Sequence, residues 1–199
     1  MQHMDELLSA ARSELILGGQ KSGKSRRAEL LARSWLAQSP SHQAVMIATA
    51  QPWDDEMRER IARHQTDRAE RVPGMQTVEE PLALGETLAR YSQPQTLVVV
   101  DCLTLWLTNL LMPAENNEQN EAAAHAARAQ VAMVLRAIEN AAGPVVLVGN
   151  EIGLGVIPLG RETRAFVDAL GLLNQQVAQA CQRVTFMAAG LPLTLKGTA

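Results

Sequence analysis

A glycine-rich octapeptide between an apolar run and a helical pattern constrains the fold of this chain more than any other segment. The octapeptide is Gly18-Gly19-Gln20-Lys21-Ser22-Gly23-Lys24-Ser25, the apolar run is Leu15-Ile16-Leu17, and the helical pattern begins near Arg26. The spacing is GxxxxGK[ST], in which glycines let backbone N–H groups curl around an anion that a Cβ would exclude. A helix that follows directs its positive end at the same anion. The sequence therefore predicts a strand, a phosphate-binding loop and a helix in succession.

Two side chains of this loop have predicted roles beyond the backbone cradle. Lys24 is expected to reach the β- and γ-phosphates of a nucleoside triphosphate, and the Ser25 hydroxyl is expected to take a place on Mg²⁺. The alternative is a glycine-rich turn that matches by chance, and the surrounding strand and helix patterns argue against it. We therefore expect the chain to bind a nucleoside triphosphate together with Mg²⁺.

Length and composition restrict the classes of protein to which this chain can belong. A chain of 199 residues suits one domain, and we expect a short extension over 1–13 and a single nucleotide-binding domain over 14–199. The net charge of −3 gives no electrostatic case for nucleic acid as a partner. Cys102 and Cys181 have no metal-type spacing and are expected to be free thiols in a reducing cytoplasm. No segment resembles a signal peptide or a membrane span.

Strand and helix patterns alternate along the chain. Strands are predicted over 14–17, 44–48, 75–78, 96–100, 145–148 and 184–187, with a tail near 193–195 that closes the sheet. Helices are predicted over 25–36, 54–71, 81–91, 103–111, 121–142 and 161–183, and a flexible loop over 112–119. This order predicts an α/β fold of the P-loop NTPase, RecA-like class, with a mostly parallel sheet covered by helices on both faces. Ligands of such sheets bind at the carboxyl ends of the strands.

Asp101 follows the most apolar of the predicted strands, Leu97-Val98-Val99-Val100. In phosphate-loop enzymes an acid at this place holds Mg²⁺ through water. The alternative is an N-cap for the helix predicted over 103–111. The two roles are compatible, and we expect Asp101 to be linked to the metal.

Asn150 and Glu151 follow another buried strand pattern, 145–148. A carboxylate delivered to the binding edge can polarise a nucleophilic hydroxyl or order the water shell of a metal. Residues of this kind also commonly end a strand and cap a turn. The spacing alone supports both interpretations equally.

The segment 54–68 carries many charges, which predicts a solvated helix with Asp54 as its cap. Opposite charges spaced four residues apart stabilise such a helix. The expected pairs are Glu56 with Arg60, and Glu59 with Arg63.

One histidine of this helix shares a face with apolar residues, because Met57, Ile61 and His64 follow the spacing i, i+4, i+7. We expect that face to turn towards the domain or a partner subunit. Beside Arg63 and Arg68, His64 can meet a phosphate, and neutral imidazole is a competent nucleophile at phosphorus. The alternative, which the residues alone favour, is a half-buried structural histidine.

The chain resembles the bifunctional adenosylcobinamide kinase / adenosylcobinamide-phosphate guanylyltransferase family of cobalamin synthesis over nearly all of 14–197. The resemblance rests on the segments 17–26, 47–50, 54–57 with Arg60, Ile61 and His64, 101–104, 108–111, and 150–158 with Arg161, Phe166 and Asn174. The phosphate loop is common to many enzymes. The Asp-Asp-Glu-Met helix with its histidine, taken together with Asn-Glu-Ile-Gly-Leu-Gly, is far more specific.

This resemblance implies two reactions. In the first, the hydroxyl of the aminopropanol arm of adenosylcobinamide attacks the γ-phosphate of GTP or ATP, with Glu151 and Asp101 both candidates for the base. In the second, GTP loses pyrophosphate and its GMP passes to adenosylcobinamide phosphate. The resemblance implies that His64 is the covalent carrier of GMP, as in nucleophilic catalysis. Lys24, the loop N–H groups and Mg²⁺ would stabilise the charge on the attacked phosphate.

Further nucleotide contacts are implied by similarity at Ala48, Thr49, Ala50, Gln65, Thr66, Asp67, Arg68, Glu79 and Asp101. The stretch 69–76 is longer than is usual in the family, so Glu80 is an alternative to Glu79. The resemblance also implies a homotrimer. Two other functions stay open: a phosphate-loop kinase of another small molecule with a structural His64, and a nucleotide-dependent switch or assembly protein.

Overall fold

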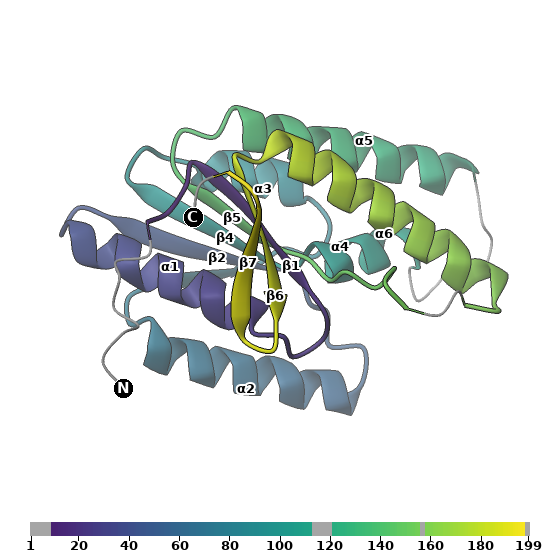
Figure 1. Ribbon diagram of the computed structural model, residues 1–199, viewed down its shortest axis with the longest axis horizontal. Coiled ribbons are helices and arrows are strands. Elements are labelled where there is room, and N and C mark those ends of the chain that lie inside the picture. The colour runs from purple at the N-terminus through teal and green to yellow at the C-terminus, as the bar shows by residue number, and fades with distance from the viewer. Residues whose placement is uncertain (1–8, 113–120, 156–157, 198–199) are drawn as a thin grey trace.

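The computed structural model describes residues 9–112, 121–155 and 158–197, which form a seven-stranded sheet with helices on its faces (Figure 1). The strands are β1 (Ser13–Gly18), β2 (Gln43–Ala48), β3 (Gln76–Glu79), β4 (Thr96–Asp101), β5 (Val145–Val148), β6 (Arg183–Ala188) and β7 (Leu191–Lys196). The helices are α1 (Lys24–Gln38), α2 (Asp55–Arg71), α3 (Leu84–Tyr91), α4 (Leu103–Leu111), α5 (Glu121–Glu139) and α6 (Arg161–Ala180).

The strand order is β3-β2-β4-β5-β1-β6-β7. All neighbouring pairs are parallel except β6 and β7, which form an antiparallel hairpin at one edge. The predicted mostly parallel sheet is therefore confirmed, and the tail does extend it. Helices α1 and α2 lie on one side of the sheet and α3, α4, α5 and α6 on the other (Figure 1). Within the described part of the chain, no helix has the length and apolar character needed to cross a membrane.

Alternation along the central strands builds a core on each face of the sheet. Leu15 and Leu17 of β1 pack with the apolar residues of α3 to α6, while Ile16 between them packs with those of α1. The same alternation recurs in β4, where Val98 and Val100 lie in the first cluster and Val99 in the second. Strands buried on both faces read as continuous apolar runs, which is why the sequence predicts them well.

Three predicted helix boundaries were wrong at one end. The last helix stops at Ala180 instead of near 183, because Cys181 is extended and buried and the chain then enters β6. The helix predicted from 81 begins at Leu84, because the Glu80 carboxylate accepts hydrogen bonds from the backbone N–H groups of Leu82 and Ala83 in a preceding turn. The helix predicted over 121–142 ends at Glu139. Most of the loop predicted over 112–119 lies outside the described residues.

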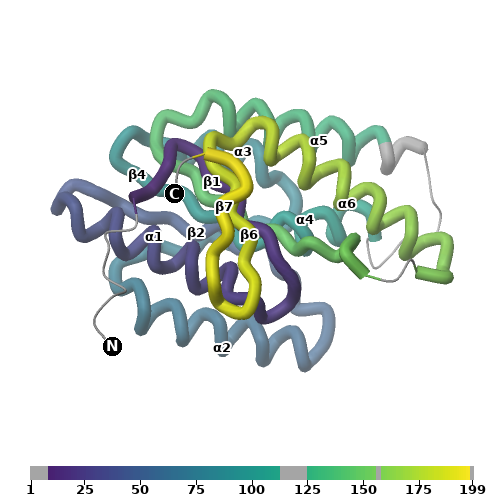
Figure 2. Tube along the Cα trace, in the orientation of Figure 1, coloured from purple at the N-terminus to yellow at the C-terminus, as the bar shows by residue number. Residues whose placement is uncertain are grey.

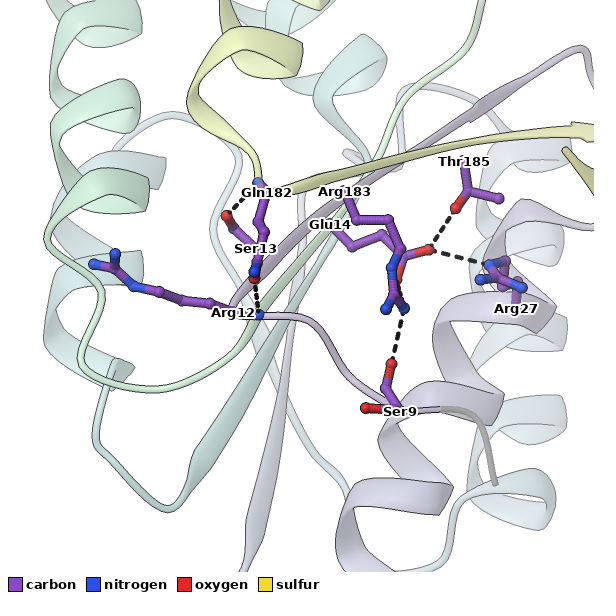
Figure 3. Close-up of polar contacts among 8 residues, drawn as sticks. All are labelled: Ser9, Arg12, Ser13, Glu14, Arg27, Gln182, Arg183 and Thr185. Atoms are coloured by element: carbon purple, nitrogen blue, oxygen red, sulfur yellow. Dashed lines mark hydrogen bonds and ion pairs between the residues drawn. The ribbon is translucent and has the colours of Figure 1, made fainter. Parts of the chain in front are cut away.

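A buried carboxylate joins three elements at the start of β1 (Figure 3). Glu14 is fully buried, and its oxygens lie 3.2 Å from Arg27 Nε of α1 and 3.4 Å from Arg183 Nη1 of β6. The Thr185 hydroxyl donates a third bond of 2.8 Å to the same carboxylate. A buried charge needs such partners, since an isolated one would be strongly disfavoured. This cluster therefore ties the first turn of α1 to the neighbouring strands β1 and β6.

Replacing Glu14 with alanine is expected to lower the free energy of unfolding by about 3–5 kcal/mol, because Arg27 and Arg183 would face each other without an anion. Urea denaturation of both proteins measures this difference. Glu14→Gln is the matched control: it preserves the volume and can still accept from Thr185, so its cost should be smaller. A loss below about 1 kcal/mol in Glu14→Ala, the value of an exposed pair, would contradict this account.

Candidate active site

The predicted site segments converge at one edge of the sheet, where the parallel strands have their carboxyl ends. The phosphate loop follows β1 and Asn150 follows β5. Ala48 at the end of β2 pairs in register with Glu79 at the end of β3 and with Asp101 at the end of β4. Five adjacent strands therefore deliver the candidate residues to the same edge, as parallel α/β sheets do for their ligands.

The phosphate loop is supported by the β6–β7 hairpin, which lies beside it in the trace (Figure 2). The backbone N–H of Gly190 in the hairpin turn donates to the Ser22 carbonyl at 3.0 Å. Gly18 has φ 151°, and a Cβ there would collide with the Met187 carbonyl of β6. Gly23 has φ 102° and caps the start of α1. Both glycines are thus required by the backbone geometry.

Lys24 is a buried cation at the first position of α1. Its Nζ donates to the Gly19 carbonyl at 2.6 Å, across the loop that it closes. Burial lowers the pKa of Lys24. Cys102 and Asp101 act to raise that pKa, and the positive charge of Arg60 lowers it further. Burial also raises the pKa of the Cys102 thiol to about 11, so that group is neutral at physiological pH. Lys24 therefore lies within electrostatic range of Asp101 and of Arg60.

Asp101 belongs to β4, and Cys102 rather than Asp101 is the N-cap residue of α4. The helix-capping interpretation of Asp101 was therefore wrong, because the strand runs one residue further than expected. A buried network fixes this strand end. Thr49 Oγ1 donates to the Cys102 carbonyl at 2.7 Å and accepts from the Cys102 N–H at 2.9 Å, across the cis Asp101–Cys102 peptide. Asn109 Nδ2 donates to the Thr49 carbonyl at 2.8 Å and to the Pro81 carbonyl at 3.1 Å.

The end of β5 is held in a similar way. The Glu151 N–H donates to the Gly18 carbonyl at 3.1 Å, which places Glu151 next to the phosphate loop. Its carboxylate accepts from the Gly153 N–H at 3.1 Å, so this residue does cap a turn. Buried Asn174 of α6 donates to the Asn150 carbonyl at 3.1 Å and to the Glu151 carboxylate at 3.4 Å. The turn does not exclude the second interpretation of Glu151, as a base, because the residue lies next to the phosphate loop.

Sequence reasoning assigned no role to the two buried asparagines, Asn109 and Asn174. Each lies in a helix whose neighbouring inward residues are apolar. A buried amide needs hydrogen-bond partners, and these two find them in the carbonyl groups of strand ends. A lone asparagine on an apolar helix face was the available signal.

Helix α2 has the cap and the half-buried face that its sequence predicts. Asp54 is its N-cap and accepts from the Met57 N–H at 2.7 Å. Met57, Ile61 and His64 are each partly buried, whereas most of their helical neighbours are exposed. The face prediction is therefore confirmed.

The predicted charge pairs of this helix are not the ones that form. Among the described residues, neither Glu56 with Arg60 nor Glu59 with Arg63 makes an ion pair, and the pairs within α2 are Arg58–Asp55 and Arg71–Asp67, both at 3.0 Å. Helical spacing permits several such pairings of similar small energy, so it does not select one.

Side-chain contacts attach helix α2 to α1 on one side and to β3 on the other. On one flank, Arg71 Nη1 lies 3.0 Å from the buried Glu29 carboxylate of α1. On the other, Gln65 Nε2 donates to Glu79 of β3 at 3.1 Å, and Arg68 Nη1 donates to the Thr77 hydroxyl at 3.1 Å. At about 100° per residue, the position of His64 falls between those of Arg71 and Gln65 around the helix axis, and the residue is partly buried.

The register of β3 separates the two glutamates that the sequence left open. Glu79 ends β3 and contacts Gln65 of α2, whereas Glu80 caps the turn before α3. Glu79 is therefore the carboxylate that lies beside the candidate nucleotide contacts.

The residues present fit a magnesium ion that is held chiefly by nucleotide phosphates. Among the described residues, no group of three His, Cys, Asp or Glu side chains could hold a metal alone. Ser25, next to Lys24 at the start of α1, offers a hydroxyl, and Asp101 at the end of β4, whose charge acts on Lys24, offers a carboxylate. One or two protein oxygens with phosphate and water complete the hard, octahedral shell that Mg²⁺ requires.

Comparison with known proteins agrees with the fold. A solved structure of flagellar accessory protein FlaH from Methanocaldococcus jannaschii superposes with a TM-score of 0.51 at 11% identity, covering 96% of this chain and 80% of that one. This likeness supports the RecA-like fold alone.

Similarity to curated proteins is much closer. The chain is 47% identical over 188 residues to the bifunctional adenosylcobalamin biosynthesis protein CobP of Pseudomonas aeruginosa, covering 92% of this chain and 97% of that protein. It is 35% identical over 187 residues to CobU of Escherichia coli, covering 92% and 98%. Residues 14–195 match the family model for cobinamide kinase / cobinamide phosphate guanyltransferase. The chain therefore belongs to this family of enzymes, which combines a kinase with a nucleotidyltransferase.

Proposed function

We propose that this enzyme phosphorylates adenosylcobinamide with GTP or ATP and then transfers GMP from GTP to adenosylcobinamide phosphate, through a covalent guanylyl group on His64. The product is adenosylcobinamide-GDP. The proposal extends to Mg²⁺ as the cation of the bound nucleotide. It also includes a homotrimer in the cytoplasm, which the family resemblance suggests.

The observation that carries the proposal is the attachment of α2 to α1, the helix that follows the phosphate loop, and to the carboxyl end of β3. Arg71 attaches the helix to α1, and Gln65 attaches it to the end of β3. The position of His64 falls between these two attachments around the helix axis, on the partly buried face. A nucleophile supported on both sides near a phosphate-binding loop suits covalent transfer, because a positioned nucleophile replaces a bimolecular encounter.

In the phosphorylation step, the substrate hydroxyl attacks the γ-phosphorus, an O–P bond forms, and the bond to the β,γ-bridging oxygen breaks. The hydroxyl proton passes to a carboxylate, for which Glu151 and Asp101 are the candidates. Lys24 and the loop N–H groups hold the phosphate oxygens, and bound Mg²⁺ supplies further charge neutralisation.

In the transfer step, a nitrogen of neutral His64 attacks the α-phosphorus of GTP and pyrophosphate leaves. An oxygen of adenosylcobinamide phosphate then attacks the same phosphorus, the N–P bond breaks, and free imidazole is restored. Ala48, Thr49 and Ala50, the run Gln65, Thr66, Asp67 and Arg68, and Glu79 and Asp101 are the proposed nucleotide contacts beside the loop. Thr49 and Asp101 suit this role because hydrogen bonds fix their backbone.

Protein labelling tests the covalent step. With Mg²⁺ and GTP labelled at the α-phosphate, the protein is expected to retain a label that is lost in acid and kept in base, as a phosphoramidate is. GTP labelled at the γ-phosphate should leave none. Peptide mapping should place the label on His64. Tight GTP binding without an α-label would instead favour a kinase of another small molecule in which His64 is structural.

The second alternative, a nucleotide-dependent switch or assembly protein, predicts slow hydrolysis that a partner protein accelerates and no transfer to a small molecule. The family match argues against it.

A further inference from the structure

The ion pair between α1 and α2 sets how far each helix extends past the other. Both helices leave the carboxyl edge of a parallel sheet, so they run in the same general direction. At about 1.5 Å per residue, Glu29 lies about 7.5 Å along α1 from Lys24, while His64 and Arg60 precede Arg71 by about 10 and 16 Å along α2. With Arg71 paired to Glu29, the part of α2 that carries His64 lies near the start of α1, where Lys24 is, and Arg60 lies about one turn further towards the start of α2.

The same residues share one stripe of the helix surface. At about 100° per residue, Arg60, His64 and Arg71 fall within about 40° of one another around the α2 axis. Arg71 contacts α1, so this stripe faces α1 and, towards the start of α2, the phosphate loop that precedes α1. In the view of Figure 1 the start of α2 extends past the end of α1 at which that loop lies.

The charges at this place are arranged as in an anion site. Arg60 makes no ion pair with any described residue, whereas Arg58 and Arg71 of the same helix are both paired. Its positive charge acts on Lys24 and contributes to the lowered pKa of that lysine. Two neighbouring cations repel each other, and an anion bound between them makes favourable interactions with both.

We propose that Arg60 binds the phosphate that His64 attacks, and that its guanidinium stabilises the charge on the non-bridging oxygens during guanylyl transfer. This role rests on the guanylyl-histidine proposed above. As the N–P bond forms and the bond to pyrophosphate breaks, negative charge grows on oxygens that a planar guanidinium can hold in two parallel hydrogen bonds. Placement one helical turn before His64 lets the nucleophile and the stabilising cation approach the phosphate from the same helix.

Single-turnover labelling with saturating α-labelled GTP tests this role. Arg60→Ala is expected to slow formation of the labelled protein about a hundredfold, the typical effect of losing one such stabilising group. Arg60→Lys keeps the charge but lacks the planar guanidinium that makes two parallel hydrogen bonds, so its labelling rate should fall about tenfold. Arg58→Ala is the matched control: its guanidinium is paired with exposed Asp55, and its rate should stay within about twofold of the wild type.

Chemical rescue separates a direct contact from a structural defect. Free guanidinium ion at millimolar concentration should restore part of the rate of Arg60→Ala and should leave Arg58→Ala unchanged. A merely structural loss would not respond. Because Arg60 is exposed, the melting temperature of the variant should match that of the wild type.

The outcomes distinguish the two proposals. A labelled wild type with a slow, rescuable Arg60→Ala supports the role of Arg60. A labelled wild type with an unimpaired Arg60→Ala overturns that role alone. A wild-type enzyme that acquires no label overturns the guanylyl-histidine intermediate and, with it, this role for Arg60.

Discussion

Replacing His64 with alanine is expected to reduce GMP transfer to adenosylcobinamide phosphate by at least about 10⁴-fold while changing the phosphorylation rate by less than about threefold. The transfer step loses its nucleophile, and nothing in the proposed phosphorylation step requires an imidazole. The variant should fold normally, because His64 is only partly buried and α2 is held by Arg71, Gln65 and Arg68 instead. Separate assays with adenosylcobinamide and with its phosphate measure the two rates.

His125→Ala is the matched control for this experiment. His125 is exposed on α5, on the opposite side of the sheet from α2, so its removal should leave both rates intact. Equal loss of both activities in a correctly folded His64→Ala enzyme would contradict the division of labour between the histidine and the phosphate loop.

The features that the sequence predicted correctly depend on short-range patterns. Each of them follows from residues that are close together in the chain. These features are the phosphate loop, the apolar strands and the face of α2 that carries His64. The convergence of Ala48, Glu79 and Asp101 at one edge follows from the parallel topology once the strands are recognised. These inferences need no knowledge of which distant side chains meet.

What the sequence could not predict depends on long-range contacts. The level of α2 beside α1 is set by Arg71 and Glu29, which are 42 residues apart in the chain. The choice between Glu79 and Glu80 depends on the register of β3, a short strand at the sheet edge with exposed residues and no continuous apolar run. The end of α6 depends on buried Cys181, whose apolar character continues the helical pattern after the helix has stopped.

The same distinction explains why Arg60 was first assigned to a surface ion pair. Spacing within α2 offers Glu56 as its partner, but the two form no ion pair in the described part of the chain, and the positive charge of Arg60 acts on Lys24 of the neighbouring helix. A pairing worth a few tenths of a kcal/mol on a helix surface is easily displaced by tertiary contacts. Charged residues whose partners lie on a neighbouring element are therefore the ones that a local pattern misplaces.

Replacing Lys24 with methionine is expected to abolish both activities, with a loss of at least about 10³-fold in each, because the same cation serves both phosphate-transfer steps. Methionine keeps much of the side-chain length and removes the charge. Isothermal titration with GTP should show affinity lost to a similar extent, whereas His64→Ala should bind GTP nearly as the wild type does. This contrast separates a defect in nucleotide binding from a defect in the transfer step.

The fold of this variant should survive, and the pKa of Lys24 explains why. Because burial lowers that pKa in the folded state, the unfolded chain binds the proton more tightly, so the charged lysine disfavours the free folded protein. That penalty is fully present at neutral pH and is relieved as the pH rises from the lowered pKa towards the ordinary value. Removing the charge offsets the lost bond to the Gly19 carbonyl, so the melting temperature should change by only a few degrees.

The dependence of GTP affinity on alkaline pH tests the phosphate-binding role of Lys24 independently. The GTP affinity of the wild type should fall as Lys24 loses its proton, starting at a lower pH than for an exposed lysine. The methionine variant should lack this part of the profile. If its residual affinity showed the same alkaline decline, or if either activity persisted within tenfold of the wild type, the phosphate contacts assigned to Lys24 would belong to another cation, and Arg60 would be the first to examine.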